Sequence, residues 1–336
     1  MSAAKAIRPV TIADVANAAG VSRATVSRVV NGLSTVDPAI AERVRATVAE
    51  LNYRPSETAR NLSLGRTHTV AVVVPDLGNP MFQAILRGVA RAAEEDGYRV
   101  LVGDTQETAS AEPQSALEAR RRCDALVLCA PRMDDEPLRE LLATTSPVAL
   151  VNRTVDDPTV PQVAMDYAQA TGLIIDHLVG LGHRHLAYLG GPVASASNRL
   201  RIAGLDEAER RHPELRIDRQ TVGSSLDSGW SSAESVLASG ATAVVAFNDL
   251  VALGIMSRLR ELDVPVPGRL SVVGVDDIPY ARISDPALTT VSVPQESLGV
   301  EAWRRLHRAM SGEGVEGTLW LEGTLHLRES TGPPAS

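Results

Sequence analysis

At 336 residues and 44% apolar composition, the chain is long enough for two or three domains and can bury a sizeable core. It contains no apolar run of membrane-spanning length, and MSAAKAIRPV lacks the apolar region of a secretory signal, so we expect a cytoplasmic protein. The formal net charge is −8, whereas residues 1–66 hold nine Lys and Arg against five Asp and Glu. A basic N-terminal part on an acidic body is typical of proteins that bind nucleic acid.

The N-terminal part predicts three short helices. Thr11, followed three residues later by Asp14, is a variant of the capping box that begins a helix. Gly20 supplies a left-handed end to this helix, and Ser22 can cap a second one. Asp37, which precedes a proline, marks the start of a third helix. Two short helices joined by a turn with glycine match a helix-turn-helix, although such pairs also occur in helical domains that bind no DNA.

The outward face of the second helix favours DNA binding, because none of its members is acidic. They are Ser22, Arg23, Ala24, Thr25, Ser27, Arg28 and Asn31. A helix with such a surface can enter the major groove, where Arg reads guanine and small side chains approach a thymine methyl group. We therefore expect this helix to read DNA bases.

From residue 69 onward, strand-like apolar runs alternate with helical stretches in two consecutive sets. The first set has the strands TVAVVVPD, RVLVGD, DALVLCA and PVALVN, and the second has HLAYLGG, QTVGS, ATAVVAFN and LSVVGV. Runs this apolar are typical of parallel strands that helices cover on both faces. We therefore expect an α/β body of two doubly wound parallel-sheet lobes. The loops beyond the carboxyl ends of their strands would face a shared cleft.

Polar and aromatic residues stand at corresponding strand ends of both sets. The candidates for binding a small molecule are Asp76, Asn79, Phe82, Asn152, Arg153, Arg201, Trp230, Asn248 and Asp276. Carboxylates, amides and Arg can hydrogen-bond the hydroxyl groups of a sugar while a ring stacks on its apolar face. Each residue taken alone fits a solvated loop or a helix cap better than a ligand site. Their recurrence at the same edge of successive strands favours a ligand site for the set. We expect Phe247, which lies within an apolar strand, to belong to the core.

The sequence lacks the motifs of nucleotide or metal chemistry. The segment 190–192, Gly-Gly-Pro, follows a strand but has no P-loop lysine, and no G-x-S-x-G elbow occurs. His183 and His185 have no acidic or Cys partner nearby in the sequence. We therefore expect no catalytic residue, no metal and no cofactor.

Segments along almost the whole chain resemble the LacI/GalR family of bacterial transcriptional regulators. The N-terminal match is TIADVANAAGVSRATVSRVVNG, followed by ELNYRPSETARNL. The later matches, in the family's order, are VVVPDLGNPMF, DHLVGLGHRHLAYLGGP, AFNDLVALG, SVVGVDDIPYAR, ALTTVSVP and LRESTGPP. The resemblance implies a helix-turn-helix head with a hinge helix, followed by a two-lobe body like that of periplasmic binding proteins.

The resemblance also implies where the parts begin and end. These are a DNA-binding head over residues 1–54, a hinge helix and linker over 55–68, and an effector-binding and dimerisation body over 69–332. Three crossovers would join the lobes, so that the helix near 295–310 returns to the first lobe and the strand near 319–328 belongs to the second. Lobe 1 would then comprise about 69–164 and 294–318, and lobe 2 about 165–293 and 319–332.

Further DNA-contacting positions lie outside the second helix of the head. They are Thr11, Tyr53, Ser56, Ala59 and Leu62. Leu62 matches the hinge leucine that, in relatives, inserts into a central base step of the minor groove and kinks the DNA. Ala59 matches a position that needs a small residue, whereas Glu57 departs from the polar or basic residue often found there.

We interpret the chain as a sequence-specific transcriptional repressor that is controlled by a small-molecule effector, a sugar or sugar derivative. Relatives that form tetramers carry a C-terminal leucine heptad, and LRESTGPPAS has none. We therefore expect a homodimer on a near-palindromic double-stranded operator, with no membrane partner. Two alternatives share parts of this pattern. One is a secreted sugar-binding protein, and the other is a cytoplasmic sugar-binding or sugar-processing protein without a regulatory role.

Overall fold

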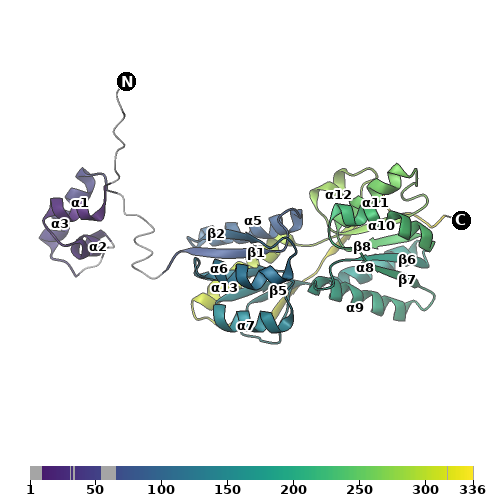
Figure 1. The fold of residues 1–336 in the computed structure, drawn as a ribbon, viewed down its shortest axis with the longest axis horizontal. Coiled ribbons are helices and arrows are strands. Elements are labelled where there is room, and N and C mark those ends of the chain that lie inside the picture. The colour runs from purple at the N-terminus through teal and green to yellow at the C-terminus, as the bar shows by residue number, and fades with distance from the viewer. Residues whose placement is uncertain (1–9, 31, 33–34, 54–65, 316, 336) are drawn as a thin grey trace, which may run out of the picture. The chain divides into compact units, whose positions relative to one another are not determined.

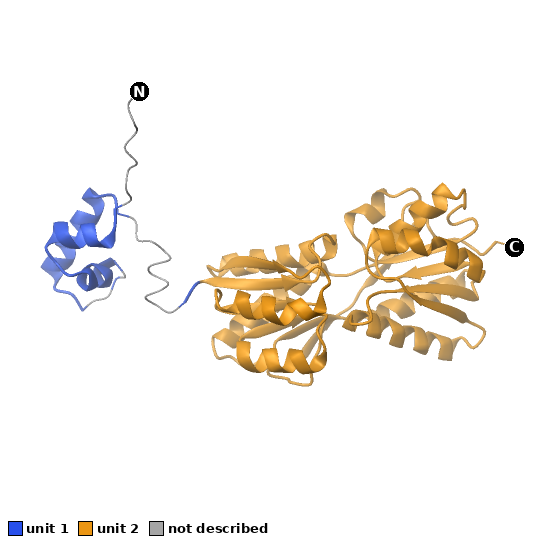
Figure 2. Ribbon diagram, viewed as in Figure 1, with its two compact units in different colours: residues 1–67 blue, residues 68–336 orange. Residues whose placement is uncertain are grey.

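The computed structural model describes residues 10–30, 32, 35–53, 66–315 and 317–335. The chain forms two compact units, residues 1–67 and residues 68–336 (Figure 2). Among the described residues, no helix is both long and apolar enough to cross a membrane. The first unit is called the head below, and the second is called the body.

The head consists of three helices, α1 (Ile12–Ala19), α2 (Arg23–Val30) and α3 (Pro38–Glu50) (Figure 1). The expected caps are present. Thr11 and Asp14 form a reciprocal capping box, and Gly20 ends α1 with a φ of 66°. The hydroxyl of Ser22 accepts a hydrogen bond from the backbone N–H three residues on, and Asp37 caps α3. Buried side chains from all three helices form a small apolar core around Val15, Val26 and Val44.

The body contains two six-stranded sheets, one in each lobe (Figure 1). Sheet 1 is parallel throughout, with the order β11 (Thr318–Leu321), β5 (Gln162–Met165), β4 (Val148–Val151), β3 (Ala125–Cys129), β1 (Thr69–Val74) and β2 (Arg99–Asp104). Sheet 2 has the order β12 (Thr324–His326), β10 (Thr289–Ser292), β9 (Ser271–Asp276), β8 (Ala243–Ala246), β6 (His185–Gly190) and β7 (Arg216–Thr221). Only its β10–β12 pair is antiparallel.

Helices cover both faces of each sheet, which is why the central strands are apolar along their whole length. In lobe 1, α5 (Pro80–Glu95) packs with α13 (Gln295–Met310), and α6 (Glu112–Arg120) packs with α7 (Asp135–Thr145). In lobe 2, α8 (Tyr167–Gly180) packs with α9 (Ala196–Arg211), and α10 (Leu226–Ser239) packs with α11 (Asp249–Glu261). A 3-10 turn, η1 (Ala109–Ala111), precedes α6, and the short helix α12 (Pro279–Ile283) follows β9. The predicted α/β fold class is confirmed.

Helix α13 returns to lobe 1 and crosses α5 with the two backbones in contact. A Cβ atom added to Gly88 of α5 would lie 2.2 Å from the carbonyl oxygen of Glu296, and one added to Gly299 would lie 2.1 Å from that of Ile85. Beyond the crossing, the fully buried indole of Trp303 donates a hydrogen bond to Asp96 at 2.7 Å. Glycine at these two positions thus allows the backbones of α5 and α13 to approach closely, although the two helices are far apart in the sequence.

The expectation of a single lobe-2 strand near 319–328 is wrong. This segment forms two short strands, β11 in sheet 1 and β12 in sheet 2, so the boundary between the lobes lies at about 322–323 rather than at 318–319. Gly323 stands between the two strands, where an added Cβ atom would lie 2.5 Å from Met165 and 2.6 Å from Val291. The chain therefore crosses between the lobes in a space that only glycine fits.

Candidate functional site

The exposed face of α2 is the first candidate site. Ser22, Arg23, Ala24 and Arg28 are exposed there, whereas Thr25 and Ser27 are half-buried. The opposite face is held by the buried side chains of Val26 and Val29. Within the part of the chain that the structure describes, the guanidinium groups of Arg23 and Arg28 make no hydrogen bond or ion pair. Two uncompensated guanidinium groups on one exposed helix face are suited to guanine edges or phosphate oxygens.

The other predicted DNA contacts differ in their surroundings. The hydroxyl of Thr11 donates to Asp14 at 2.7 Å, so it is already engaged in the cap. Tyr53 is half-buried and packs against the core of the head. Asn31, Ser56, Ala59 and Leu62 lie outside the described residues.

The second candidate site is a cavity between the two lobes of the body, at the carboxyl ends of the strands. Six of the nine residues expected at a ligand site line it: Asn79, Phe82, Asn152, Arg201, Asn248 and Asp276. The rest of the lining is Met81, Glu107, Ala130, Arg132, Tyr167, Ser197, Ser224 and Phe247. Its volume of about 20 Å³ leaves room for one or two water molecules.

Three asparagines anchor the elements around this cavity, which we call the central cavity. Asn79 caps α5 and Asn248 caps α11, each by accepting a backbone N–H at 2.9 Å. Asn248 also donates to the carbonyl of Ser224 at 2.9 Å. Asn152 has a left-handed backbone with a φ of 54°, and its amide joins the hydroxyl of Tyr167 to the backbone of lobe 1. These amides hold the cavity walls in position.

Arg201 and Asp276 are the polar groups of the central cavity whose hydrogen-bonding capacity is least used. The guanidinium of Arg201 lies between two rings, with Tyr167 at 3.9 Å and Phe247 at 4.4 Å. Its Nη1 donates to the carbonyl of Ser197, whereas its buried Nε has no partner among the described residues. Asp276 is 3% exposed and has a φ of 120°, and in the described part of the chain nothing bonds to its Oδ1. Burial raises the pKa of Asp276 to about 7, against the opposing effect of Arg201.

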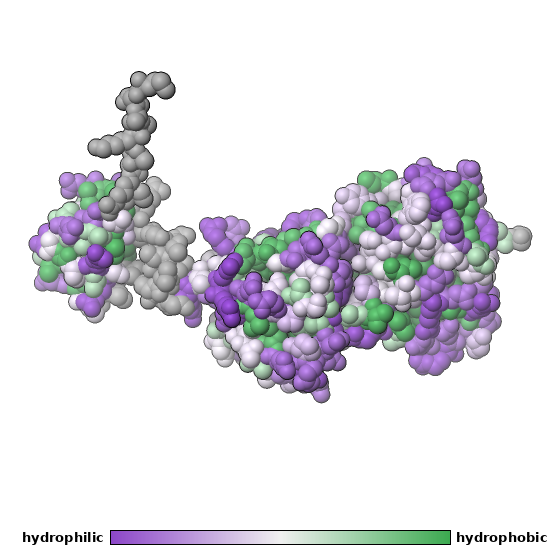
Figure 3. All heavy atoms as spheres, in the orientation of Figure 1, coloured by the Kyte–Doolittle hydropathy of each residue, from purple (hydrophilic) through white to green (hydrophobic). Residues whose placement is uncertain are grey.

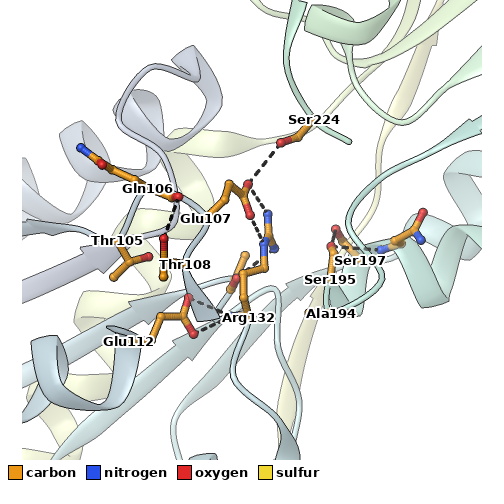
Figure 4. Close-up of polar contacts among 12 residues, drawn as sticks. Thr105, Gln106, Glu107, Thr108, Glu112, Arg132, Ala194, Ser195, Ser197 and Ser224 are labelled. Carbon is orange, nitrogen blue, oxygen red and sulfur yellow. Dashed lines mark hydrogen bonds and ion pairs between the residues drawn. The ribbon is translucent and has the colours of Figure 1, made fainter. Parts of the chain in front are cut away.

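An ion pair between the buried Arg132 and the half-buried Glu107 forms part of the lobe-1 wall. Arg132 donates to Glu107 through Nε at 2.6 Å and through Nη2 at 2.9 Å (Figure 4). Its Nη1 donates to the carbonyl of Ala130 at 2.9 Å. From lobe 2, the hydroxyl of Ser224 reaches Glu107 at 3.3 Å (Figure 4). Glu112 supports the wall by accepting the backbone N–H of Arg132. The Glu107–Ser224 hydrogen bond therefore spans the cleft between the lobes.

The sequence analysis does not identify this ion pair. Glu107 follows β2 and Arg132 follows β3, so the strand-end criterion that selected the other residues applies equally to them. Phe247 is buried, at 5% exposure, as expected of a core residue. It is also one of the two rings that flank Arg201 in the central cavity, which the sequence analysis does not predict.

Three residues expected at the ligand site do not line the central cavity. Asp76 is half-buried and accepts the backbone N–H of Gly78 at 2.7 Å within its own turn. Trp230 is 41% exposed and stacks on Arg258 at 4.4 Å. It lies outside the cavity because α10 begins four residues earlier, at Leu226, so the indole projects from a helix and not from the preceding loop. Arg153 lines a separate cavity.

The histidines of LGHRHL have structural partners. His183 is buried, and its ring nitrogens lie 2.8 Å from the hydroxyl of Thr242 and 2.9 Å from the carbonyl of Gly332. His185 lies 2.8 Å from a carboxylate oxygen of Asp218. Among the residues that the structure describes, no group of three or more His, Cys, Asp or Glu is placed to hold a metal ion.

Two family descriptions match the chain. Residues 11–56 match "Bacterial regulatory proteins, lacI family", and residues 175–331 match "Periplasmic binding protein-like domain". The chain is also 32% identical to the HTH-type transcriptional regulator AscG of Escherichia coli (strain K12), over 97% of this chain and 99% of that protein. It is 32% identical to the lactose operon repressor of the same organism, over 98% of this chain and 92% of the repressor.

Solved structures resemble the chain along almost its full length. The lac repressor dimer bound to operator and the anti-inducer ONPF has a TM-score of 0.84 and 31% identity, covering 97% of this chain and 100% of the other. A complex of the transcriptional regulator CelR with cellobiose has a TM-score of 0.70 and 30% identity, covering 96% of this chain and 100% of the other.

Proposed function

Because this chain belongs to the lacI family of bacterial regulatory proteins and is a DNA-binding transcriptional regulator, we propose that it is a homodimeric repressor whose operator affinity is set by a sugar or sugar derivative in the central cavity. It would act in the cytoplasm, where its operator lies. The proposed head covers residues 1–54 and the hinge 55–68, with Asn31, Ser56, Ala59 and Leu62 among the DNA contacts. The proposed effector-binding and dimerisation body covers 69–332.

The observation that carries the effector proposal is the pair of unpartnered polar atoms in the central cavity. An unpartnered donor on Arg201 and an unpartnered acceptor on Asp276 each carry the cost of a buried polar group without a hydrogen bond. A ligand hydroxyl can donate to the carboxylate and accept from the guanidinium, and it removes both costs. The rings of Phe82 and Phe247 line the same cavity and can cover an apolar sugar face. The complex of the similar regulator CelR with cellobiose supports a carbohydrate as the class of effector.

Ligand binding must also move the lobes or their side chains. A space of about 20 Å³ cannot hold a monosaccharide, so the walls have to separate. The Glu107–Ser224 hydrogen bond joins the lobes across the cavity, and a ligand that separates them breaks it. A ligand that prefers one lobe arrangement shifts the equilibrium toward that arrangement, which is how the cavity can control the head.

Exposed apolar side chains on lobe 2 support the proposed dimer. Ile283 and Tyr280 of α12 are 78% and 53% exposed, and Leu226 of α10 is 48% exposed. On the face of the body shown in Figure 3, hydrophobic areas alternate with hydrophilic ones. A second copy of the chain would bury such side chains in an isologous interface.

Fluorescence anisotropy of labelled DNA from the region upstream of the chain's own gene tests this function. We expect binding of that DNA in preference to random DNA, and a change in its affinity with one member of a carbohydrate panel. A thermal-shift screen with the same panel should identify the effector, because a ligand that binds only the native state raises its melting temperature. Carbohydrate binding without preferential DNA binding would instead favour a sugar-binding protein with no regulatory role.

A further inference from the structure

A second cavity between the lobes adjoins the central cavity and has a different character. Asn152 lines both of them. The second cavity has a volume of about 160 Å³ and is bounded on the lobe-1 side by Arg153, Thr154 and Ala164. On the lobe-2 side, its wall consists of Ala196, Arg199 and Leu200, all from the first turns of α9.

The guanidinium of Arg153 is buried in this wall with part of its charge uncompensated. Its side chain is 2% exposed. Nη2 donates to Asp135 at 2.5 Å and to the carbonyl of Met133 at 3.2 Å, whereas no residue that the structure describes bonds to the buried Nε. Asp135 keeps 75% of its side chain in solvent, which weakens its compensation of the buried charge. Since Arg153 lines the cavity, an anion bound there would stabilise its buried, partly compensated charge.

The opposite wall is also electropositive. Arg199 is exposed, and within the described ranges its guanidinium makes a single, long hydrogen bond, from Nη1 to the carbonyl of Ala194 at 3.5 Å. The first turns of α9, a helix of 16 residues, line the cavity beside it. The first N–H groups of a helix lack partners within the helix, and their dipoles attract anions. Cations on two lobes therefore face one space.

The positive charges of Arg153 and Arg199 repel each other across this cavity. Burial, and then the positive charge of Arg199, lower the pKa of Arg153. An anion between two like charges converts their repulsion into two attractions. Since the two arginines belong to different lobes, a bound anion would also draw the lobes together on this side of the cleft.

We propose that the second cavity binds an oxyanion, a phosphate or carboxylate group, between Arg153, Arg199 and the N-terminus of α9. Because Asn152 also lines the central cavity, this oxyanion is either a substituent of the effector sugar or a free anion beside it. The first of these sources rests on the proposed effector function, whereas the anion site itself does not.

Thermal unfolding of the full chain in inorganic phosphate, at ionic strength held constant with NaCl, tests the site. We expect the melting temperature of the wild type to rise with phosphate and to saturate. The rise should be lost in Arg199→Gln. It should persist in Arg210→Gln, which removes the same charge from an exposed position on the last turn of α9, where Arg210 pairs with Glu207. An equal response of all three proteins would show general ionic stabilisation, and the proposal would be wrong.

Paired sugars separate the two sources of the anion. Each neutral hexose of a panel is compared with its 6-phosphate and its uronic acid in the wild type and in Arg199→Gln. If the anionic member of a pair gives a larger shift that depends on Arg199, the effector carries the oxyanion. If inorganic phosphate alone gives an Arg199-dependent shift, the anion is free. If no oxyanion probe depends on Arg199, the site does not exist, while a response to neutral sugars would leave the central cavity as the effector site.

Discussion

Replacement of Asp276 by asparagine tests whether the buried carboxylate in the central cavity lowers the free energy of unfolding of the body. Burial raises the pKa of the Asp276 carboxyl from 3.8 to about 7, so the native state holds this proton until about pH 7 while the unfolded chain releases it near pH 4. The native state therefore binds more protons in this window, and the free energy of unfolding falls as the pH rises through it. A separation of about three pH units corresponds to about 4 kcal/mol, which is fully lost above pH 7.

Asparagine has nearly the same shape and no charge to bury. We therefore expect the free energy of unfolding of Asp276→Asn at pH 8 to exceed that of the wild type by up to about 4 kcal/mol. At pH 5 this difference in the free energy of unfolding should be smaller by about 3 kcal/mol. The same change should weaken the effector response, because the carboxylate that accepts from the ligand is gone. Stability would thus rise as function falls, as is common at binding sites.

Urea unfolding at pH values from 5 to 8 measures this gap. All three tryptophans, Trp230, Trp303 and Trp320, belong to the body, so tryptophan fluorescence reports its unfolding and not that of the head. Asp263→Asn, at an exposed position in the same lobe, is the matched control and should not alter the pH dependence. If Asp276→Asn and the wild type lose stability in parallel from pH 5 to 8, the buried carboxyl does not ionise as argued here.

Four further predictions concern packing, base recognition, the hinge and assembly. Gly299→Ala places a Cβ atom 2.1 Å from the carbonyl oxygen of Ile85, so urea unfolding should show a free energy of unfolding of the body lower by about 1–3 kcal/mol. Gly180→Ala is the control, because its added Cβ atom meets no described atom within 4 Å, and it should not lower that free energy. Arg28→Ala should weaken the binding free energy for operator DNA by about 1–3 kcal/mol in anisotropy titrations. An equal loss of binding free energy for random DNA would make Arg28 a phosphate contact instead. Leu62→Ala should weaken operator binding and leave effector affinity unchanged by calorimetry; matching losses of both would contradict its role in the hinge. Light scattering at micromolar concentration should give a dimer, and a stable tetramer would refute that assembly.

Local signals in the sequence were sufficient for the head and for most of the body. The cap formed by Thr11 and Asp14, and the left-handed turn at Gly20, act within a few residues of their own position. Strands such as β3 read as unbroken apolar runs because helices cover both of their faces. Their alternation with helices therefore predicted two parallel-sheet lobes.

The convergence of the strand ends was also predictable in part. The carboxyl ends of parallel strands meet at one edge of a sheet, so Asn79, Asn152, Asn248 and Asp276 come together without any knowledge of their contacts. The direction of a single side chain was not predictable in this way. Trp230 turns away from the central cavity because its helix begins earlier than the loop pattern indicates, and Arg258 on α11 gives its ring a partner.

Tertiary structure alone decided the features that depend on distant parts of the chain. Strands β5 and β10 are only four residues long, and each is defined by neighbours on both sides in its sheet. The segment around Gly323 divides between two sheets because β11 pairs with β5 and β12 pairs with β10. Met165 and Val291 leave little space for a side chain at the crossing between them. The pairing of Arg132 with Glu107, and its link to Ser224, joins loops 25 and 117 residues apart. Caps and apolar periodicity are properties of neighbouring residues, whereas sheet edges, cavity walls and buried charge pairs exist only once separate segments have packed together.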